Sequence, residues 1–146
     1  MYNLKKCGGS FKGIIGECLF KLTNDKVIVT KFFNKSKYLD IFGRYFNEEQ
    51  KSFLINNWYS IDAIDIFPNI TLYEIKTRNR YAKPLYFKPK MTLQTHNLYN
   101  EAKRLNFNVV MITVWLNEEW DYEVEMQEFD EKNYCIDKSK RYDKKS

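Results

Sequence analysis

The chain has few of the residues that define whole classes of protein. Of its 146 residues only three are cysteines, Cys7, Cys18 and Cys135, and they lie far apart without forming a CxxC motif. This pattern argues against a disulfide scaffold and against a zinc site, and it indicates a reducing compartment. Because His96 is the only histidine, Ser-His-Asp and Cys-His catalysis are disfavoured.

Several kinds of segment are missing as well. No stretch is long and apolar enough to span a membrane, and the first residues show no signal-peptide pattern. We therefore expect a soluble intracellular protein of the cytoplasm or nucleus, with no membrane partner and with a viral origin left open. Internal repeats, a glycine-rich phosphate loop and a dinucleotide fingerprint are also lacking.

What is present fits one domain with a proper core, because 44% of the residues are hydrophobic. The formal net charge is +5. This mild basic bias permits a polyanionic partner without requiring one.

The stretch 60–80 predicts a β-hairpin around which the chain is organised. Ile61–Phe67 and Ile70–Thr77 are rich in β-branched and aromatic residues, and Pro68-Asn69 lies between them as the turn. Charged residues interrupt both strands, at positions where a sheet core does not tolerate charge without a reason. They are Asp62, Asp65, Glu74 and Lys76.

Two of these charges must share a face of the sheet. Side chains alternate along a strand, so Glu74 and Lys76 point the same way. An acid and a lysine on one face, with an aspartate from the neighbouring strand, form a group suited to a divalent cation. Carboxylates supply oxygen ligands for Mg²⁺, and the lysine can hold an attacking water or the charge that builds on a phosphate.

The hairpin register decides which aspartate joins them. If the turn centres on Asn69, Asp62 faces Lys76 across the hairpin. If it centres between Pro68 and Asn69, Asp65 shares the face of Glu74 instead, because a shift of one residue exchanges the faces. We prefer Asp62 and keep Asp65 as the alternative.

The remaining elements follow from periodicity and caps. Ser10 caps a helix that runs to about Leu22, with a buried stripe of Phe11, Ile14, Ile15, Cys18, Leu19 and Leu22. Gly13 and Gly16 inside it suggest a close approach by another element or by a phosphate backbone. Glu17 beside them is either a solvated glutamate or a site residue.

Further along the chain, helices and strands alternate. Asn47 and Gln50 form a capping box, Gln94 is expected to face inward near the start of a helix capped by Thr92, and the apolar run after that helix is typical of a central strand. In order, we expect strand Val27–Phe33, helices Tyr38–Phe46 and Glu48–Trp58, the hairpin, helix Leu93 to about Leu105, strand Val109–Leu116 and edge strand Trp120–Phe129.

Basic residues alternate with aromatic ones after the hairpin. Cations bind phosphates and rings stack on bases, so this stretch suits a nucleic-acid groove; the competing interpretation is an edge strand protected by lysines. The basic residues in question are Arg78, Arg80, Lys83, Lys88 and Lys90.

An aspartate followed by Glu74-Ile75-Lys76 resembles the motif of the PD-(D/E)XK nuclease superfamily, which includes restriction enzymes and Holliday junction resolvases. Similar proteins begin with a helix that carries a glutamate, as at Gly16-Glu17, and some carry a glutamine where Gln94 stands. The resemblance implies an α/β, restriction-endonuclease-like core: a mixed central β-sheet flanked by helices, with a helical insertion at about 37–58. Residues 1–130 would form one nuclease-like domain, followed by a charged tail at 131–146.

The resemblance also implies a function, that of a metal-dependent endonuclease that hydrolyses DNA, in the manner of a resolvase in recombination or repair. Asp62 or Asp65, Glu74 and the Ile75 carbonyl would bind Mg²⁺ or Mn²⁺. Lys76 would orient water, while Glu17 would help to position the metal and Gln94 would hold a phosphate or a water. A homodimer is expected, because small resolvase-like enzymes make paired cuts.

Two other interpretations remain open at the level of sequence. One is an inactive nucleic-acid-binding or assembly module on the same fold, against which clustered buried charge argues. The other is a plain structural ion-pair cluster in a protein of unrelated function.

Overall fold

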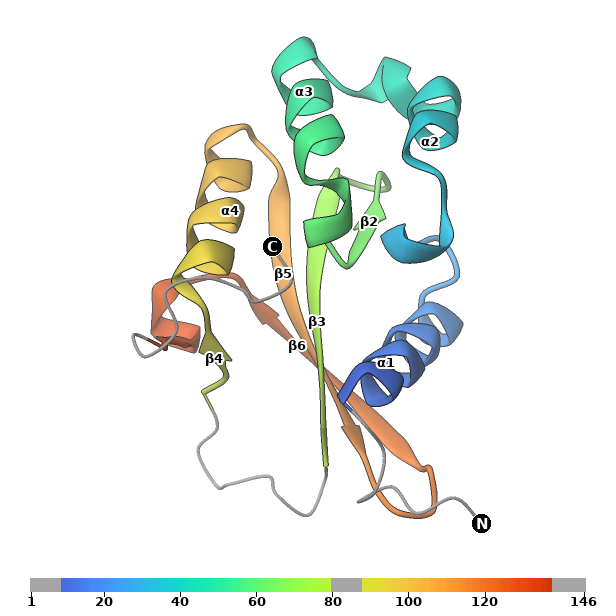
Figure 1. The fold of residues 1–146 in the computed structure, drawn as a ribbon, viewed down its shortest axis with the longest axis vertical. Helices are drawn as coiled ribbons and strands as arrows, with labels where there is room; N and C mark the ends of the chain where they lie inside the picture. Colours follow the sequence, from blue (N-terminus) through green and yellow to red (C-terminus); the bar gives the residue numbers. More distant parts are fainter. Residues whose placement is uncertain (1–8, 80–87, 138–146) are drawn as a thin grey trace.

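A mixed five-stranded sheet lies at the centre of the computed structural model, which describes residues 9–79 and 88–137 (Figure 1). Its strand order is β1-β2-β3-β5-β6. The first three strands are antiparallel, β3 and β5 are parallel, and β6 closes the order antiparallel to β5. The bounds are β1 Ile28–Val29, β2 Ala63–Asp65, β3 Thr71–Asn79, β5 Asn108–Leu116 and β6 Tyr122–Glu128.

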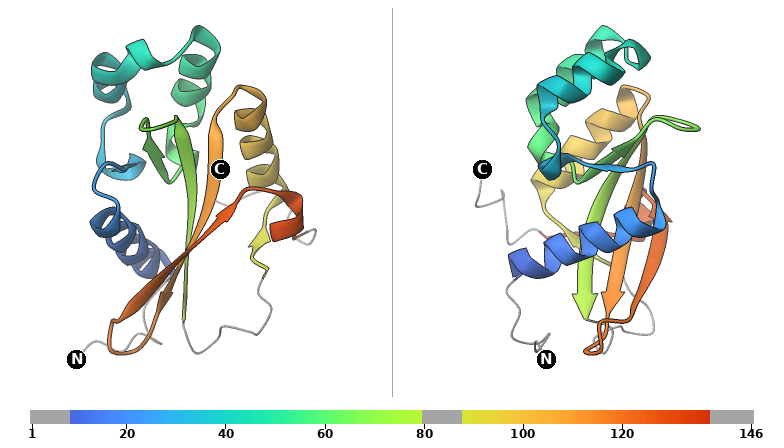
Figure 2. Two further views of the ribbon diagram at one scale, coloured as in Figure 1. Left: turned by 180° about the vertical axis from the view of Figure 1, so that it is seen from behind. Right: turned by 90° about the vertical axis from the view of Figure 1, so that its right-hand side faces the viewer.

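Helices cover both faces of this sheet. The α-helices are α1 Gly9–Thr23, α2 Lys35–Phe42, α3 Glu48–Asn57 and α4 Leu93–Arg104. Short 3-10 helices lie at Thr30–Phe32, Gly43–Tyr45, Trp58–Ser60 and Glu131–Asn133. In the views of Figure 2, α1 crosses the strands at one level, whereas α3 and α4 lie side by side over the other half of the sheet.

The alternation of side chains along the strands produces two cores. On the α1 face, Phe20 packs with Tyr73 and Ile75 of β3 and with neighbouring residues of β5. On the other face, Leu72 packs with side chains from α3 and α4, among them Leu54 and Tyr99. The α/β class with a mixed sheet flanked by helices is therefore confirmed.

Two of the helix starts that the sequence predicts are present, whereas Ser10, the predicted cap of the first helix, lies inside α1. Asn47 accepts a hydrogen bond from the Gln50 amide N–H at 2.8 Å, and the Gln50 side chain accepts one from the Asn47 N–H at 3.0 Å, which completes the capping box of α3. Thr92 accepts from the Thr95 N–H at 3.1 Å at the start of α4. Each cap satisfies N–H groups that a helix start leaves without partners inside the helix.

The buried stripe predicted for α1 is wrong in its details. Of the predicted residues, Phe11, Ile14, Cys18 and Leu22 are exposed. The face that meets the sheet carries Gly16, Glu17 and Phe20 instead. Gly16 allows this face to pack closely against β3, because any Cβ at that position would collide with the Thr77 side chain, whereas Gly13 has open space around it.

Two predicted segments before the hairpin are shorter or displaced. The strand expected at Val27–Phe33 has only the two residues of β1 before the chain turns into a 3-10 helix. The helix expected at Tyr38–Phe46 begins earlier and ends at Phe42.

The hairpin is present with a register that the sequence did not single out. Ala63 pairs with Tyr73 and Asp65 with Thr71, so the connection spans residues 66–70 and centres on Pro68. This register differs by two positions from the preferred one, and a shift of two leaves every side chain on its expected face. Asp62 therefore shares the face of Glu74, while Asp65 lies on the opposite one.

The segment after Asp130 continues the fold. Tyr134 is buried in the α3–α4 core, and β7, Cys135–Ile136, pairs in parallel with β4, Lys90–Met91. The boundary expected at residue 130 thus does not coincide with the end of packed structure, and the rest of the expected tail, 138–146, lies outside the described residues. Within the described part of the chain, none of the helices has the length and apolarity needed to cross a bilayer.

Candidate functional site

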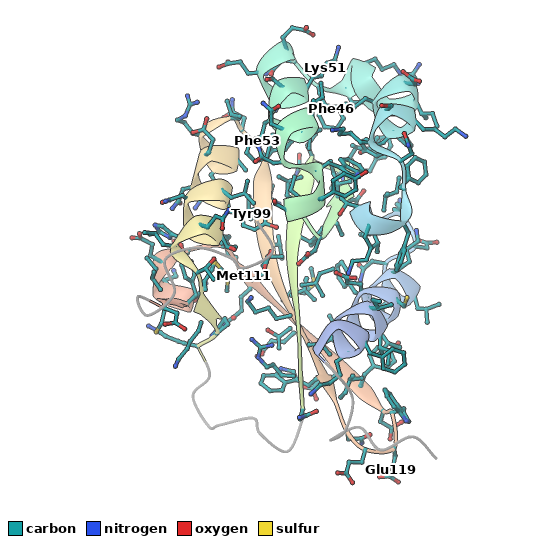
Figure 3. All side chains as sticks on the ribbon, in the orientation of Figure 1. Phe46, Lys51, Phe53, Tyr99, Met111 and Glu119 are labelled. Carbon is teal, nitrogen blue, oxygen red and sulfur yellow. The ribbon has the colours of Figure 1, made fainter. Side chains whose placement is uncertain are left out.

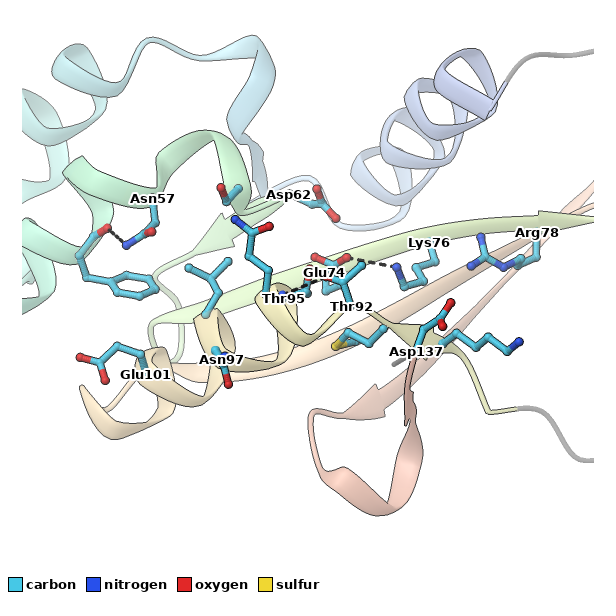
Figure 4. Close-up of a pocket in the computed structure, with 16 residues that line it drawn as sticks. Asn57, Asp62, Glu74, Lys76, Arg78, Thr92, Thr95, Asn97, Glu101 and Asp137 are labelled. Atoms are coloured by element: carbon cyan, nitrogen blue, oxygen red, sulfur yellow. Dashed lines mark hydrogen bonds and ion pairs between the residues drawn. The ribbon is translucent and has the colours of Figure 1, made fainter. Parts of the chain in front are cut away.

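The predicted acid and lysine side chains line one cavity of about 840 Å³ above β3 (Figure 4). Glu74 and Lys76 come from alternate positions of β3, and Asp62 comes from the residue just before β2. Continuing the observed pairing of Ala63 with Tyr73 by one residue places Asp62 opposite Glu74. The register thus gathers the three groups that the motif requires.

The Asp62 carboxyl is held against the backbone of β3. Its Oδ2 accepts a hydrogen bond from the Ile75 N–H at 2.7 Å. The pKa of this carboxyl is well above its ordinary value, chiefly because burial disfavours its charge and then because the Glu74 carboxylate lies nearby. Glu17 acts in the same direction, and the Ile75 N–H and Lys76 oppose the rise.

Glu74 has a partner on each oxygen. Its Oε2 lies 3.4 Å from Lys76 Nζ in an ion pair, and its Oε1 accepts a hydrogen bond from the Tyr99 hydroxyl at 2.9 Å. Tyr99 is completely buried on α4. Burial first, and then the charges of Glu74 and Asp62, raise the pKa of its phenol, so Tyr99 stays a hydrogen-bond donor to the carboxylate.

Tyr99 is the site residue that sequence reasoning missed. The sequence predicts a buried stripe of Leu98, Ala102 and Leu105 on this helix. Tyr99 precedes Ala102 by one helical turn, which places both on one side of α4. A buried tyrosine hydroxyl usually has a hydrogen-bond partner. A tyrosine at a stripe position beside the hairpin was therefore the signal that could have identified it.

Glu17 is buried behind the cavity and does not line it. Its Oε1 forms an ion pair of 3.0 Å with Lys31. The negative charge of Glu17 nevertheless contributes to the raised pKa of Asp62. The structure thus brings Glu17 into the electrostatic surroundings of the site, as a residue that acts through others.

Gln94 and Asp65 are placed differently from the expectation. Gln94 lines the cavity, but its side chain is exposed and does not face the core. Asp65 lies on the α1 side of the sheet, and its Oδ1 accepts a hydrogen bond from the Phe67 N–H at 3.0 Å. Asp65 is therefore not placed to share a metal with Glu74.

The predicted basic residues are partly in place. Arg78 and Lys90 line the cavity, and burial lowers the pKa of the Arg78 guanidinium. Lys88 is exposed and lies outside the cavity lining. Arg80 and Lys83 fall outside the described residues.

The carboxylate oxygens of Asp62 and Glu74 are the kind of ligand that a hard divalent cation prefers. Within residues 9–79 and 88–137, no group of three or more histidine, cysteine, aspartate or glutamate side chains is close enough to hold a metal. Mg²⁺, however, is commonly held through one or two carboxylates, with waters and substrate phosphates as its other ligands. Asp62 and Glu74 provide such a pair, and their mutual repulsion is what a cation between them would relieve.

No family model matches the chain, and neither the curated proteins nor the solved structures compared with it give a match.

The site therefore has to be interpreted from its own chemistry. It combines two carboxylates, one of them raised in pKa, a lysine ammonium within reach of one of them, and two further cations along the same cavity. Such a site can bind a phosphate and, with a metal, activate a water beside it.

Proposed function

We propose that the chain is a metal-dependent nuclease of the PD-(D/E)XK type that hydrolyses phosphodiester bonds in DNA. The observation that carries this proposal is the meeting of Asp62, Glu74 and Lys76 in one cavity, with Asp62 opposite Glu74. Two carboxylates from adjacent strands and a lysine two residues on are what metal-assisted hydrolysis of a phosphodiester needs.

The order of elements supports the finer fold that goes with this proposal, a restriction-endonuclease-like core. A helix with a buried glutamate, Glu17 on α1, comes first, followed by β1 and the hairpin β2–β3. Then α4 crosses over to β5, which pairs in parallel with β3. This is the order that the resemblance implies, with α2 and α3 as the helical insertion.

In this mechanism Asp62, Glu74 and the Ile75 carbonyl would hold a Mg²⁺ or Mn²⁺, which would supply charge stabilisation for the phosphate and lower the pKa of a bound water. Tyr99 fixes the orientation of the Glu74 carboxylate through its 2.9 Å hydrogen bond. Lys76, held at 3.4 Å from Glu74, orients the attacking water and stabilises charge on the phosphate oxygens. Gln94 donates an amide hydrogen bond to a phosphate or a water.

Other residues act around that centre. Arg78 and Lys90 bind phosphates next to the scissile bond, because they line the same cavity. Glu17 adds negative charge that favours cation binding at Asp62. A branched substrate of recombination or repair and a homodimer complete the proposal; they follow from the resemblance alone.

A second candidate function, DNA binding without catalysis, is favoured by one observation. The Glu74 and Glu17 carboxylates already have lysine partners, Lys76 and Lys31. A site whose charges are compensated within the protein can persist without a metal. Isothermal titration with Mn²⁺ separates the two functions: a nuclease site binds the cation and loses that binding in Glu74→Gln, whereas an inactive module shows no binding that depends on Glu74.

The direct test is a cleavage panel on duplex, single-stranded and branched DNA with Mg²⁺ or Mn²⁺. We expect cleavage that stops with a chelator and in Lys76→Met, while the melting temperature of the variant is retained. The matched control is Lys26→Met, which removes an exposed lysine that does not line the cavity. Full activity in Lys76→Met would refute the assignment.

A further inference from the structure

The cavity above β3 changes its chemistry from one end to the other (Figure 4). The cations Lys76 and Arg78 lie toward one end, together with Asp137, and Asp62 and Glu74 lie in the middle. Lys90 lines the same end from β4, because the Asp137 N–H donates to the carbonyl of the next residue, Met91, at 2.8 Å. Toward the other end the lining is amide, hydroxyl and apolar, apart from the carboxylate of Glu101. These lining residues are Phe53, Asn57, Ser60, Asn97, Leu98 and Glu101.

Two helices form the walls of this second end. Asn57 lies at the end of α3, and Asn97 and Leu98 lie on α4. Asn57 uses its amide N–H to donate to the Phe53 carbonyl at 2.9 Å, which leaves its side-chain oxygen as an acceptor. Figure 3 shows Phe53 and Tyr99 on α3 and α4, over the upper half of the sheet. The helical insertion is therefore a wall of the cavity.

The space between α3 and α4 is closed beyond these residues. The Gln50 side-chain N–H donates to the Leu105 carbonyl at 2.9 Å, in a buried hydrogen bond that ties α3 to the end of α4. The Phe53 and Phe107 rings pack behind it with centroids 5.5 Å apart. Between the two helices, a strand that enters from the cationic end therefore meets packed side chains at this wall.

The two ends also differ in charge. Glu101, the acidic residue of the far end, is exposed, and its carboxylate accepts a hydrogen bond from Arg104 Nε at 2.9 Å, so its charge is compensated within α4. Cations gather where a backbone would lie, and amides and apolar carbons gather where a base would lie. Amides hydrogen-bond base edges, and apolar side chains pack against base faces.

We propose that this groove takes a free single-stranded DNA end, with the terminal base between α3 and α4 and the phosphates along Lys76, Arg78 and Lys90. This inference rests on the proposed nuclease function and deepens it by naming the substrate from the lining of the cavity, in place of the branched substrate that the resemblance alone implies. Because the carboxylates lie between the two ends, the bond cut is close to the terminus, and the products are short. Continuous duplex passing over the groove has no base to place at the closed end.

The test compares one single-stranded DNA oligonucleotide with its ligated circle of identical sequence. Cleavage is measured with Mn²⁺, and binding is measured with the Glu74→Gln variant by competition. We expect the linear form to be cut to short products while the circle is spared. We also expect the linear form to bind at least about tenfold tighter, which one seated base supplies.

Variants locate the base. Asn97→Trp fills the closed end from an exposed position of α4 and should remove the preference for the linear form. Asn56→Trp places the same side chain at an exposed position of α3 outside the cavity and should leave the preference unchanged.

Each outcome has a defined meaning. Equal cutting or equal binding of circle and linear form overturns the end-binding groove but leaves the nuclease intact. Cleavage of neither form, with tighter binding of the linear one, refutes the nuclease and keeps the groove. Loss of the preference in both tryptophan variants would show that the closed end is not where the base sits.

Discussion

The two faces of β3 use alternate residues of one nine-residue strand for different purposes. Toward α1, Tyr73 and Ile75 are buried against Phe20 in an apolar core. Toward α3 and α4, Glu74, Lys76 and Arg78 are half-buried in a cavity. A strand can support a charged site because its opposite face, packed in an apolar core, supplies the stability that the site does not.

The largest expected effect is on the charged face. Glu74→Gln keeps the shape of the side chain but removes a carboxylate charge, so we expect Mn²⁺-dependent cleavage to fall at least about 100-fold with no loss of melting temperature. Ile112→Val is the control from the apolar face, next to Ile75 in register. It should cost about 0.5–1.5 kcal/mol of unfolding free energy and leave cleavage unchanged. If the Ile112 variant folds but loses cleavage, the apolar face also contributes to activity, which would contradict the separation of roles between the two faces.

The next effect is on the packed face. Gly16→Ala places a Cβ against Thr77 and should lower the free energy of unfolding by about 1–3 kcal/mol. Gly13→Ala, three residues away with open space around it, should raise it by about 0.5–1 kcal/mol because alanine favours helix. Urea denaturation of the two variants measures the difference. The same sign for both would show that α1 does not press on β3 at Gly16.

A smaller effect is expected from Glu17, which belongs to the packed face but acts on the charged one. Glu17→Gln should weaken Mn²⁺ binding about tenfold, because it removes negative charge near Asp62. Lys31→Met removes the ion-pair partner of Glu17 and should leave Mn²⁺ affinity unchanged or higher. Isothermal titration measures both, and equal weakening in both variants would mean that only the packing of α1 matters.

The smallest effect expected is a pH-dependent change in stability. The pKa of Asp62 is raised in the folded protein, so the folded state holds this proton to a higher pH than the unfolded chain. Stability therefore falls as the pH rises from about 4, the unfolded value, through the folded pKa, and it is level above that. Asp62→Asn should melt higher than wild type at neutral pH and lose this decline.

The control for Asp62 lies on the other face of the same hairpin. Asp65→Asn changes a carboxyl that accepts the Phe67 N–H and should leave the decline in place. Thermal melts across the pH range distinguish the two variants. A decline that survives in Asp62→Asn would assign it to another group.

Local chemistry made much of this fold predictable. The alternation at Glu74 and Lys76, the capping box at Asn47 and the cap at Thr92 each involve residues a few positions apart, and the structure has all of them. The continuous apolar run of β5 likewise predicted a central strand. Such local patterns can be recognised without knowing which distant residues pack against them.

The features that depend on distant partners were not predictable. Glu17 is buried because Lys31, on the 3-10 helix that follows β1, reaches it. The buried face of α1 was misassigned because it is set by the close packing of Gly16 against Thr77. These residues are about sixty positions apart in the sequence, so the periodicity within the helix gives no information about their contact. The hairpin register fell two positions from the preferred one because the five-residue connection centres on Pro68 and not on Asn69.

The hydrogen bond from Gln50 to Leu105 has a kinetic consequence. It joins the beginning of α3 to the end of α4 through a buried pair, so the two helices separate only if both lose their packing and open together as one cooperative unit. A terminal base seated between them as proposed would therefore leave along the cavity and not by separation of the helices. Its residence time would then depend on the contacts that hold the phosphates at the cationic end.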